Sequence, residues 1–404
     1  MDDRIVVVGA GQAGAAAAAR LRALGHEGPL TLVGAEPVPP YQRPPLSKKY
    51  LTGEMARDRL LLRPEGFWAD QRIDLRLGTP VTAIDRAAGT VTAAGQAIGW
   101  DRLILATGAS PRRLPAALGG HLPGVFVMRD LADADAMAAA FVPGARVAII
   151  GGGYIGLEAA AVAAARGLRV TLLEAAPRLL SRVACAETAE WFRALHRAHG
   201  VEVLEGAAVA GLTGTDRVTG VALADGRHIA CDFAVTGIGV TPGTALAEAA
   251  GLAIHDGIAV DALGRTSDPR VWAAGDCASF PHGAARLRLE SVQNAIDQAE
   301  TVAANMMGAT RPYAPVPWFW SDQYDVKLQI AGLGTGADRI VLRDGAGDGR
   351  SHWYFAGPRL LAVDAMNDAR AYMVGKRLIE AGRSADPAAL SDPAIDLKDL
   401  LRAG

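Results

Sequence analysis

The sequence predicts an α/β protein, because a short apolar strand, a glycine-rich turn and an alanine-rich helix follow one another twice within its 404 residues. The first copy begins at Ile5 and the second at Arg146. Unbroken apolar runs of this kind are typical of strands buried on both faces of a parallel sheet. From Pro315 onward aromatic residues and alternating segments replace this pattern, which predicts a C-terminal α+β domain.

The composition narrows the class of partner. Half of the residues are hydrophobic, 21% are charged and the net charge is −2, as in an ordinary globular chain. Such a balance gives no reason to expect nucleic acid or an anionic membrane as a partner. The acidic start Met1-Asp2-Asp3 predicts no signal peptide, and no apolar run reaches membrane-spanning length.

The cysteines predict neither a disulfide framework nor a metal site. Cys185, Cys231 and Cys277 are far apart, odd in number and without C-x-x-C spacing. We therefore expect a cytoplasmic protein that binds no metal.

The first copy reads as a phosphate-binding turn. Gly9, Gly11 and Gly14 follow the strand 5–8 in a G-x-G-x-x-G pattern, and an alanine-rich helix runs from there to Gly25. The first glycine permits a sharp bend, the second lets a pyrophosphate approach the backbone, and the third allows close packing of helix on strand. Taken alone, the motif also fits a tight turn in any α/β sheet.

Two features after this helix could contact a ligand. A second strand, 30–33, is followed by Glu36, the candidate acid for an adenosine ribose. The loop 37–48 contains five prolines and carries Arg43 and Lys48. Because proline fixes φ, this loop is stiff and can hold a cation against a ligand. A solvated lysine on a surface loop is the alternative.

Three later strands end in small residues, where a flat ligand can approach the backbone. Ligands in open α/β sheets bind at the carboxyl ends of strands. The residues at these ends are Ala106, Thr107 and Gly108, Gly237 and Ile238, and Gly275 and Asp276.

The second copy is complete. The strand 146–150 leads into the turn Gly151-Gly152-Gly153-Tyr154-Ile155-Gly156, then a helix, then a strand that ends at Glu174. Glu174 lies 23 residues after Gly151, close to the spacing of a ribose-binding acid. Because both copies keep their glycines, two bound dinucleotides are a better interpretation than one site and a dead copy. The pair expected is FAD with NAD(H) or NADP(H), as in flavoenzymes that take hydride from a nicotinamide.

Further motifs extend over nearly the whole chain, and with them the sequence resembles the FAD-dependent NADH–ferredoxin reductases of oxygenase systems. The shared motifs are Pro44-Pro45-Leu46-Ser47-Lys48, Leu105-Ala106-Thr107-Gly108, Gly151 to Glu158, Thr266-Ser267-Asp268-Pro269, Gly275-Asp276 and Pro317-Trp318-Phe319-Trp320-Ser321-Asp322-Gln323.

The resemblance implies a two-segment FAD-binding domain, 1–107 and 240–315, an NAD-binding domain at 108–239 and a C-terminal domain at 316–404. Both nucleotide domains are expected to be Rossmann-like. By position, Ala13, Ala35, Lys48, Val81, Arg129, Asp276 and Val292 match residues that contact FAD in the family. Ala35 replaces the aspartate common there, so the ribose contact shifts to Glu36 or is lost. Ser291 and Arg182 complete the expected cofactor-binding set.

The resemblance also implies hydride transfer from NADH to FAD and single-electron transfer to a [2Fe–2S] ferredoxin that feeds a mono- or dioxygenase. Asp276 would contact the ribityl chain, and the helix that begins at Val292 would direct its dipole at the flavin. Lys48 and Glu158 would form a pair beside the two rings. Trp320 would cover the flavin, or else be a core tryptophan of the third domain. Lys48, Glu158 and Trp320 are thus the expected catalytic residues.

Several alternatives differ in partner or class. Disulfide reductases need a redox cysteine pair, and related peroxidases and oxidases need a cysteine in the loop that here reads Leu46-Ser47-Lys48. Both features are absent from this sequence, which disfavours these classes. A rubredoxin reductase would differ only in its partner, and an apoptosis-inducing-factor-like protein would signal through assembly. Monomer and weak dimer stay open. Glu174 predicts a preference for NADH, against which Arg178 and Arg182 could favour a phosphate.

Overall fold

Two units make up the chain in the computed structural model, which describes residues 2–402. Unit 1 consists of the described residues up to Arg43 together with Ala56–Ser110 and Val240–Pro315. Unit 2 consists of Pro44–Met55, Pro111–Gly239 and the described residues from Val316 onward. Each unit has its own buried core.

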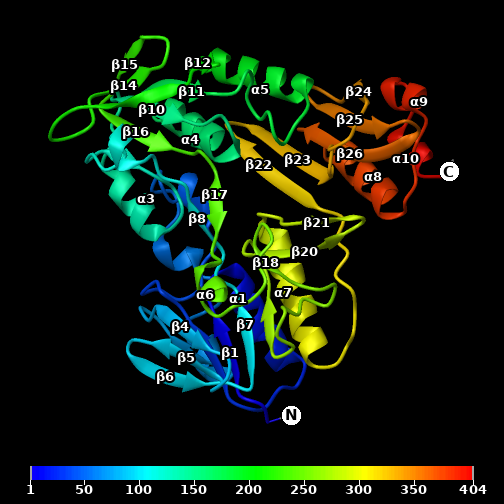
Figure 1. Cartoon of the computed structure of the whole chain (residues 1–404). Coiled ribbons are helices and arrows are strands. Elements are labelled where there is room, and N and C mark those ends of the chain that lie inside the picture. The colour runs from blue at the N-terminus through cyan, green and yellow to red at the C-terminus, as the bar shows by residue number, and fades with distance from the viewer. Residues whose placement is uncertain (1, 403–404) are drawn as a thin grey trace. The chain divides into compact units, whose positions relative to one another are not determined.

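A five-stranded parallel sheet forms the centre of unit 1 (Figure 1). All its strands except the edge strand Asp74–Arg76 are mainly apolar and buried, and the carboxyl ends of the strands lie along one edge. In spatial order the strands are β19 (Val271–Ala273), β7 (Arg102–Leu105), β1 (Ile5–Val8), β2 (Leu30–Val33) and β3 (Asp74–Arg76).

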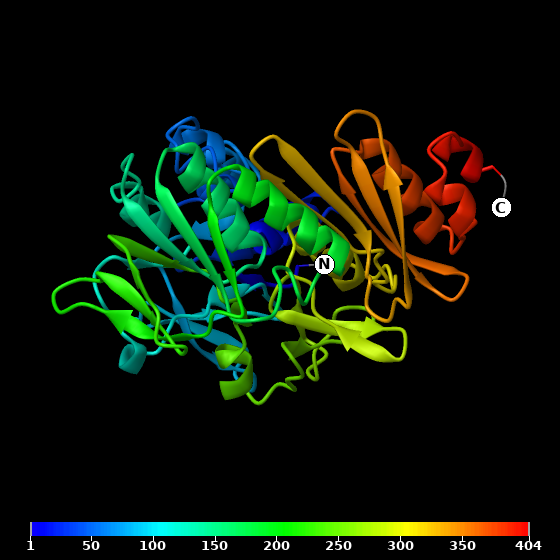
Figure 2. The ribbon, with the colours of Figure 1, turned by 90° about the horizontal axis from the view of Figure 1, so that it is seen from above.

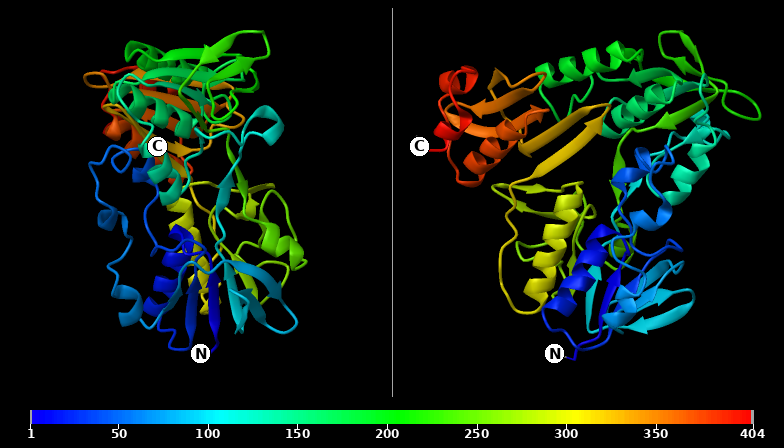
Figure 3. Two further views of the ribbon diagram at one scale, coloured as in Figure 1. Left: turned by 90° about the vertical axis from the view of Figure 1, so that its left-hand side faces the viewer. Right: turned by 180° about the vertical axis from the view of Figure 1, so that it is seen from behind.

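Two long helices accompany this sheet. Helix α1 (Gln12–Ala23) packs against α7 (Val292–Met306), and Figure 3 shows them side by side in blue and yellow. Alanines on α1 permit this close approach, because Ala17 and Ala18 are completely buried. The short helices of this unit are α2 (Phe67–Asp70) and α6 (Ala245–Ala249).

Smaller β structures complete unit 1. One antiparallel sheet is β4 (Val81–Asp85), β5 (Thr90–Ala93) and β6 (Gln96–Gly99), and another group is β18 (Ile258–Ala259), β20 (Ala278–His282) and β21 (Ala285–Leu287). Strand β8 (Ala109–Pro111) pairs with β17 (Val240–Pro242), where the chain passes between the units.

A second five-stranded parallel sheet lies in unit 2. Its strands in order are β12 (Glu202–Glu205), β11 (Arg169–Glu174), β10 (Arg146–Ile150), β16 (Phe233–Thr236) and β9 (Val125–Phe126). The helices beside it are α3 (Leu131–Ala138), α4 (Tyr154–Ala165) and α5 (Ala186–Ala198). A small antiparallel sheet follows, β13 (Val209–Thr213), β14 (Gly220–Leu223) and β15 (His228–Ala230).

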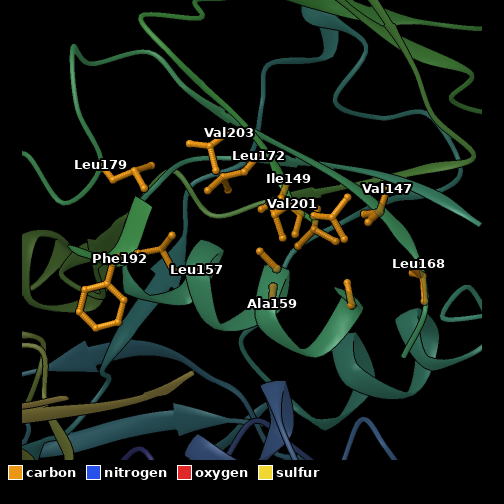
Figure 4. Packing of buried hydrophobic residues seen from close by; sticks show 14 of the residues in the cluster. Val147, Ile149, Leu157, Ala159, Leu168, Leu172, Leu179, Phe192, Val201 and Val203 are labelled. Carbon is orange, nitrogen blue, oxygen red and sulfur yellow. The ribbon is translucent and has the colours of Figure 1, made fainter. Parts of the chain in front are cut away.

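A hydrophobic core lies between this sheet and the helices beside it. Ile149 of β10 and Leu172 of β11 point at Leu157 and Ala159 of α4, as Figure 4 shows. Phe192 of α5 closes one end of the same cluster. All five are at most 1% exposed. Burial of each of the four large side chains, those other than Ala159, therefore contributes about 1.5–3 kcal/mol to stability.

The C-terminal part of unit 2 is an antiparallel sheet covered by helices, as the sequence predicts. The strands in order are β22 (Trp318–Gln323), β23 (Val326–Gly332), β26 (Arg359–Met366), β25 (Arg350–Ala356) and β24 (Arg339–Asp344). The helices are α8 (Ala369–Glu380), α9 (Pro387–Ser391) and α10 (Leu397–Leu400). Arg343, 6% exposed, donates to the carbonyls of Leu390, Asp392 and Ile395 and so anchors the final segment.

A buried polar cluster joins α5 to this sheet, and Figure 2 shows α5 lying along it. The Thr188 hydroxyl donates to Asp364 at 2.7 Å and lies 2.7 Å from Nδ1 of His352. The Tyr354 hydroxyl donates to the same carboxylate, and the Cys185 amide donates to Tyr354 at 2.8 Å. Burial lowers the pKa of His352 to about 4 and raises the pKa of Asp364 to about 6.

Mild acid should destabilise unit 2. Burial also lowers the pKa of His196 to about 4. His196 and His352 therefore bind protons more tightly in the unfolded chain than in the folded one. Each therefore removes about 1.4 kcal/mol of stability per pH unit between about pH 6.5 and 4. Asp364 has the opposite sign, because the cost of burying its charge disappears as the pH falls below about 6. With two groups against one, the net effect is a loss.

Urea denaturation at several pH values measures this dependence. We expect the midpoint to fall between pH 6.5 and 4.5, to fall less steeply in His196→Gln and to fall more steeply in Asp364→Asn. A midpoint that is independent of pH in the unsubstituted protein would contradict this assignment.

One part of the predicted FAD-binding segment lies elsewhere. Pro44–Met55 packs in unit 2, where Leu51 joins the core beneath α4. The sequence places Lys48 and Glu158 in different nucleotide-binding domains, whereas the structure places both in unit 2. The reason is the 3₁₀ turn Pro44–Ser47, which contacts α3 and α4.

Candidate functional site

The first glycine turn leaves space above the start of α1. Gly9 has φ +112°, and a Cβ there would lie 2.1 Å from the Ala106 carbonyl oxygen. A Cβ on Gly14 would lie 1.8 Å from the Gly9 carbonyl oxygen. A Cβ on Gly11, by contrast, would meet nothing within 4 Å. Two glycines thus permit close packing of the chain on itself, and the middle one faces room for a ligand.

The second turn, in unit 2, repeats this geometry. Gly151 has φ +111°, and a Cβ there would lie 2.4 Å from the Gly237 carbonyl oxygen. A Cβ on Gly156 would lie 1.9 Å from the Gly151 carbonyl oxygen, just as a Cβ on Gly14 would clash with the Gly9 carbonyl oxygen. Gly153 faces open space. Ile238 follows Gly237 after β16, while Tyr154 and Ile155 begin α4.

The two helices that follow these turns start without a cap. The N-cap residues are Gly11 before α1 and Gly153 before α4, so no side chain accepts a hydrogen bond from the first backbone N–H groups of either helix. Neither first turn holds an acidic residue. The other described helices of eight or more residues are capped by side chains of Asp130, Cys185, Ser291 and Asp368. Free N–H groups and a positive dipole end therefore face the space above each glycine turn, which suits a pyrophosphate.

Glu174 is held at the end of β11 beside the second turn. Its two carboxylate oxygens accept bonds from the Gly152 amide at 2.6 Å and the Ala176 amide at 2.7 Å. Arg178 is turned away, because its guanidinium donates to the Leu179, Ser181 and Cys185 carbonyls. Arg182 is exposed and lies near Gly239. Of these charges, the backbone holds the Glu174 carboxylate beside the second turn and holds the Arg178 guanidinium away from it.

The corresponding acid of unit 1 has other partners. Glu36 accepts a bond from the Tyr41 hydroxyl at 2.5 Å and pairs with Arg43 at 2.5 Å. Ala35 is exposed just after β2. Arg43 therefore orients Glu36 within the loop instead of reaching outward as a lone cation.

The carboxyl ends of β7 and β19 bring three predicted elements together in unit 1. Ala106, Thr107 and Gly108 follow β7, and Gly275 and Asp276 follow β19, its parallel neighbour. Ala13 of α1 lies against Gly275, because a Cβ on that glycine would come within 2.9 Å of it.

Helix α7 adds polar groups to this end of the sheet. Ser291 caps α7, which begins at Val292, by accepting a bond from Asn294. Gln298 accepts a bond from the Gly275 amide at 2.8 Å. The buried Nε2 of Gln298 and Oε1 of Gln293 have no hydrogen-bond partner within the described residues. Such groups fit a polar ligand at this edge.

In unit 2 a buried carboxylate forms the strongest charged cluster. Glu158 of α4 is 5% exposed, and Lys48 approaches its Oε2 at 2.6 Å. The Ser47 hydroxyl donates to the same oxygen at 3.2 Å, and the Ser321 hydroxyl donates to Oε1 at 2.8 Å. The predicted ion pair between Lys48 and Glu158 is confirmed. Its burial is tolerated because each carboxylate oxygen is also hydrogen-bonded.

Trp320 does not join this cluster. Side chains alternate along β22, so Phe319 and Ser321 face α4 while Trp318 and Trp320 face the other side. Accordingly Phe319 packs on Tyr154 at 4.7 Å between ring centroids, and Trp320 lies 5.7 Å from Trp318. Trp320 is half-buried, so both interpretations of it given above stay open.

The other predicted positions are separate. Val81 begins β4 in unit 1. Arg129 lies in unit 2, where its amide donates to the Asp133 carboxylate at 3.0 Å. Cofactor contacts at these two positions stay predictions.

Sequence reasoning missed the roles of Ser321, Gln323 and His196. The first two lie within the motif 317–323 and are two positions apart on β22, so their side chains share one face of the strand. His196 carries no comparable signal, since only folding places α5 beside β22. The structure connects it to Gln323 at 2.8 Å.

Two searches of the structure give no candidates. No group of His, Cys, Asp and Glu among residues 2–402 is arranged to hold a metal ion. Within the same residues, no helix is both long and apolar enough to cross a membrane.

Comparison with known proteins agrees with this geometry. The family model described as pyridine nucleotide-disulphide oxidoreductase matches residues 3–299, and the model described as reductase C-terminal matches residues 318–401.

Full-length relatives are similar over nearly every residue. A ferredoxin–NAD(P)(+) reductase of a Sphingomonas species is 44% identical, with 98% of this chain and 97% of the relative covered. Rhodocoxin reductase of Rhodococcus erythropolis is 43% identical, with 98% and 93% covered. Among solved structures, the covalent putidaredoxin reductase–putidaredoxin complex matches with a TM-score of 0.96 at 40% identity, with 100% of this chain and 99% of that chain covered.

Proposed function

The chain belongs to the ferredoxin reductases of the pyridine nucleotide-disulphide oxidoreductase family, and from this premise we propose that it transfers hydride from NADH to FAD and then passes single electrons to a [2Fe–2S] ferredoxin that feeds an oxygenase. One observation carries the proposal. Two uncapped glycine turns occur in a chain whose three cysteines are all buried and unpaired. Two dinucleotides can bind, and no thiol pair stands between them and the acceptor.

The residues of unit 1 fit FAD. The uncapped α1 with the open Gly11 would hold the pyrophosphate. Asp276 and the unpartnered amide of Gln298 lie at the carboxyl edge of the same sheet, where a polar chain would pass. The capped start of α7 would direct its dipole at the pyrimidine end of the flavin.

The residues of unit 2 fit NADH. The uncapped α4 with the open Gly153 would hold a second pyrophosphate, and Glu174 would accept bonds from the adenosine ribose hydroxyls. When bound, the two cofactors supply the hydride and one-electron chemistry. The protein supplies orientation and charge.

We assign Lys48 and Glu158 to the end of this site where the nicotinamide reacts. Glu158 follows the glycine turn by two residues, so it lies on the first turns of the helix that binds the pyrophosphate. Lys48 is half-buried and pairs with the buried Glu158 carboxylate. Trp320 would shield the flavin from water until NADH enters.

The cysteines cannot serve as a relay. Burial raises the pKa of Cys185 and Cys277, and raises the pKa of Cys231 to about 11. The loop Leu46-Ser47-Lys48, in which a peroxidase of this fold would need a cysteine, contains none. Electrons therefore leave singly, to an iron–sulfur centre.

The proposed division of labour follows the predicted domains. Residues 1–107 and 240–315 bind FAD, residues 108–239 bind NAD, and residues 316–404 form the third domain. We place the reaction in the cytoplasm, with support from the unpaired cysteines. The active form is a monomer or a weak dimer.

Asp276→Ala should lose FAD. Removing a hydrogen bond to a charged group costs about 1.5–3 kcal/mol, which weakens binding by about tenfold or more. The purified variant should release flavin on dilution and filtration, while Asp216→Ala, at an exposed position, keeps it. Full retention of flavin by Asp276→Ala would remove this residue from the site.

Steady-state turnover with NADH and a panel of acceptors tests the function. We expect [2Fe–2S] ferredoxins, followed by cytochrome c as final acceptor, to be reduced far faster than dioxygen or a disulfide. Faster reduction of a rubredoxin would identify the alternative partner class. Peroxide formation at the rate of ferredoxin reduction would overturn the proposal. A reduced protein that retains NAD and passes on no electrons would instead support a signalling role.

A further inference from the structure

We propose that Ser321, Gln323 and His196 are positioning residues that hold the Glu158 carboxylate in one orientation for the hydride step, an inference that rests on the proposed function. Together with Tyr324 they form a hydrogen-bonded row within unit 2. None of these four residues belongs to the predicted catalytic or cofactor-binding set.

The row runs without interruption from the ion pair to the edge of the C-terminal sheet. Ser321 Oγ lies 2.8 Å from Glu158 Oε1, and Gln323 Nε2 lies 3.2 Å from Ser321 Oγ. Gln323 Oε1 lies 2.8 Å from His196 Nε2, and the Tyr324 hydroxyl lies 3.2 Å from His196 Nδ1. Ser321, Gln323 and His196 are all completely buried. Bulk water therefore cannot supply the hydrogen bonds of these side chains.

Their chemistry permits a single direction of donation. A carboxylate only accepts, so the Ser321 hydroxyl donates to Glu158 and accepts from the Gln323 amide group. The Gln323 carbonyl must then face His196, which donates from Nε2. That leaves Nδ1 to accept from the Tyr324 hydroxyl. Every donor in the row points toward Glu158, an arrangement in which each bond polarises the next.

The state of His196 agrees with this direction. Burial lowers its pKa to about 4, partly opposed by the bond to Gln323, and His199 lowers it further. The neutral ring has one donor and one acceptor nitrogen, as the row requires. His199 stacks on Tyr324 at 3.7 Å and ends the row on exposed surface.

The consequence concerns the two oxygens of Glu158. Lys48 and Ser47 hold Oε2, whereas only Ser321 holds Oε1 among the described contacts. The bond from Ser321 therefore fixes the rotation of the carboxylate plane about the side chain. Ser321 is in turn oriented by Gln323, and Gln323 by His196. A loss at either remote residue should free the carboxylate while leaving the ion pair intact.

Two substitutions of Gln323 separate positioning from simple packing. Gln323→Met keeps the volume and removes both polar ends. Gln323→Glu keeps the shape but makes this position an acceptor, so the Ser321 hydroxyl turns away from Glu158. A residue that only holds α5 on β22 would tolerate Glu, which still accepts from His196. Gln96→Glu, at an exposed position of β6, is the control for the added charge.

Single-turnover reduction of the bound flavin by NADH is the first measurement. We expect the limiting rate to fall by about tenfold or more in Gln323→Glu and Gln323→Met, with the NADH dissociation constant changed by less than about threefold. In a Glu158→Gln background, Gln323→Met should change the limiting rate by less than about twofold, because it acts through Glu158. Wild-type rates in both Gln323 variants, or equal effects in the two backgrounds, would overturn the proposal.

The second measurement needs no turnover. In oxidised holoprotein with ¹³Cε1-labelled histidine, the resonance that disappears in His196→Gln identifies His196. Its titration midpoint should rise by about one pH unit or more in Gln323→Glu, because the new carboxylate stabilises the imidazolium. An unchanged midpoint would show that Gln323 and His196 are not bonded as described. If NADH fails to reduce the wild-type flavin, the proposed function fails and the positioning role with it. Normal wild-type reduction with normal Gln323 variants rejects the positioning role alone.

Discussion

Lys48→Ala is expected to slow the reduction of the bound FAD by NADH about 10²-fold, while the affinity for NADH changes much less. The size is taken from the removal of one preorganised hydrogen-bond donor in an active site, which typically costs about 10²–10³ in rate. Lys48 Nζ lies 2.6 Å from a carboxylate that is 5% exposed. Its removal leaves that carboxylate buried without a cation and displaces it from its orientation.

Stopped-flow absorbance at the flavin band measures this rate over a range of NADH concentrations. Lys49→Ala is the matched control, because Lys49 is the adjacent lysine and is exposed. The double variant Lys48→Met/Glu158→Gln should regain stability but not rate, since it removes the unpaired charge without restoring the positive one. A wild-type limiting rate in Lys48→Ala would leave Lys48 as a structural residue only.

The second large effect concerns the choice of nicotinamide. We expect kcat/KM for NADH to exceed that for NADPH at least about tenfold, which is 1.4 kcal/mol. The Gly152 and Ala176 amides fix the Glu174 carboxylate, which in the proposed site would meet the adenosine ribose. The 2′-phosphate of NADPH would meet this carboxylate, and a like-charge pair at 4 Å costs up to about 4 kcal/mol before screening. Solvent reduces that value, since Glu174 is only half-buried.

The nearby arginines test the alternative explanation. Arg178 is committed to three carbonyl oxygens, so Arg182 is the residue available to a phosphate. Glu174→Ala should narrow the preference mainly through faster use of NADPH, and Arg182→Ala should not narrow it. Equal kcat/KM for the two nicotinamides in the unsubstituted enzyme would contradict the assignment of Glu174.

Local chemistry made much of the fold predictable. Gly9 and Gly151 both have φ above +110°, and the backbone packs against each so closely that only glycine fits. A constraint of this kind depends on a single residue and can be recognised in the sequence. The strand, turn and helix around each of these glycines can then be predicted. The segment 352–355 likewise lies in a strand of the antiparallel C-terminal sheet, as the sequence predicts, although all four of its residues are buried and do not alternate.

The partners of individual charged side chains and the contacts between distant segments were not predictable in the same way. The sequence offers Arg43 as a cation for a ligand, but the structure pairs it with Glu36, seven residues earlier. Residues 44–55 pack in unit 2, where the turn 44–47 contacts α3 and α4 and Leu51 joins the apolar core, and no local sequence pattern indicates these contacts. The bond between His196 and Gln323 joins residues 127 positions apart. These are consequences of tertiary packing, which overrides local preference.

The central claim is that two electrons enter as hydride and leave singly, and an anaerobic stoichiometric titration tests it most directly. Purified enzyme with a tenfold excess of oxidised [2Fe–2S] ferredoxin would receive NADH in small portions, while absorbance records the flavin and the ferredoxin separately. The account predicts that each NADH reduces two ferredoxin molecules and that the flavin returns to its oxidised spectrum after each addition. A flavin that stays reduced, with the ferredoxin still oxidised, would contradict it.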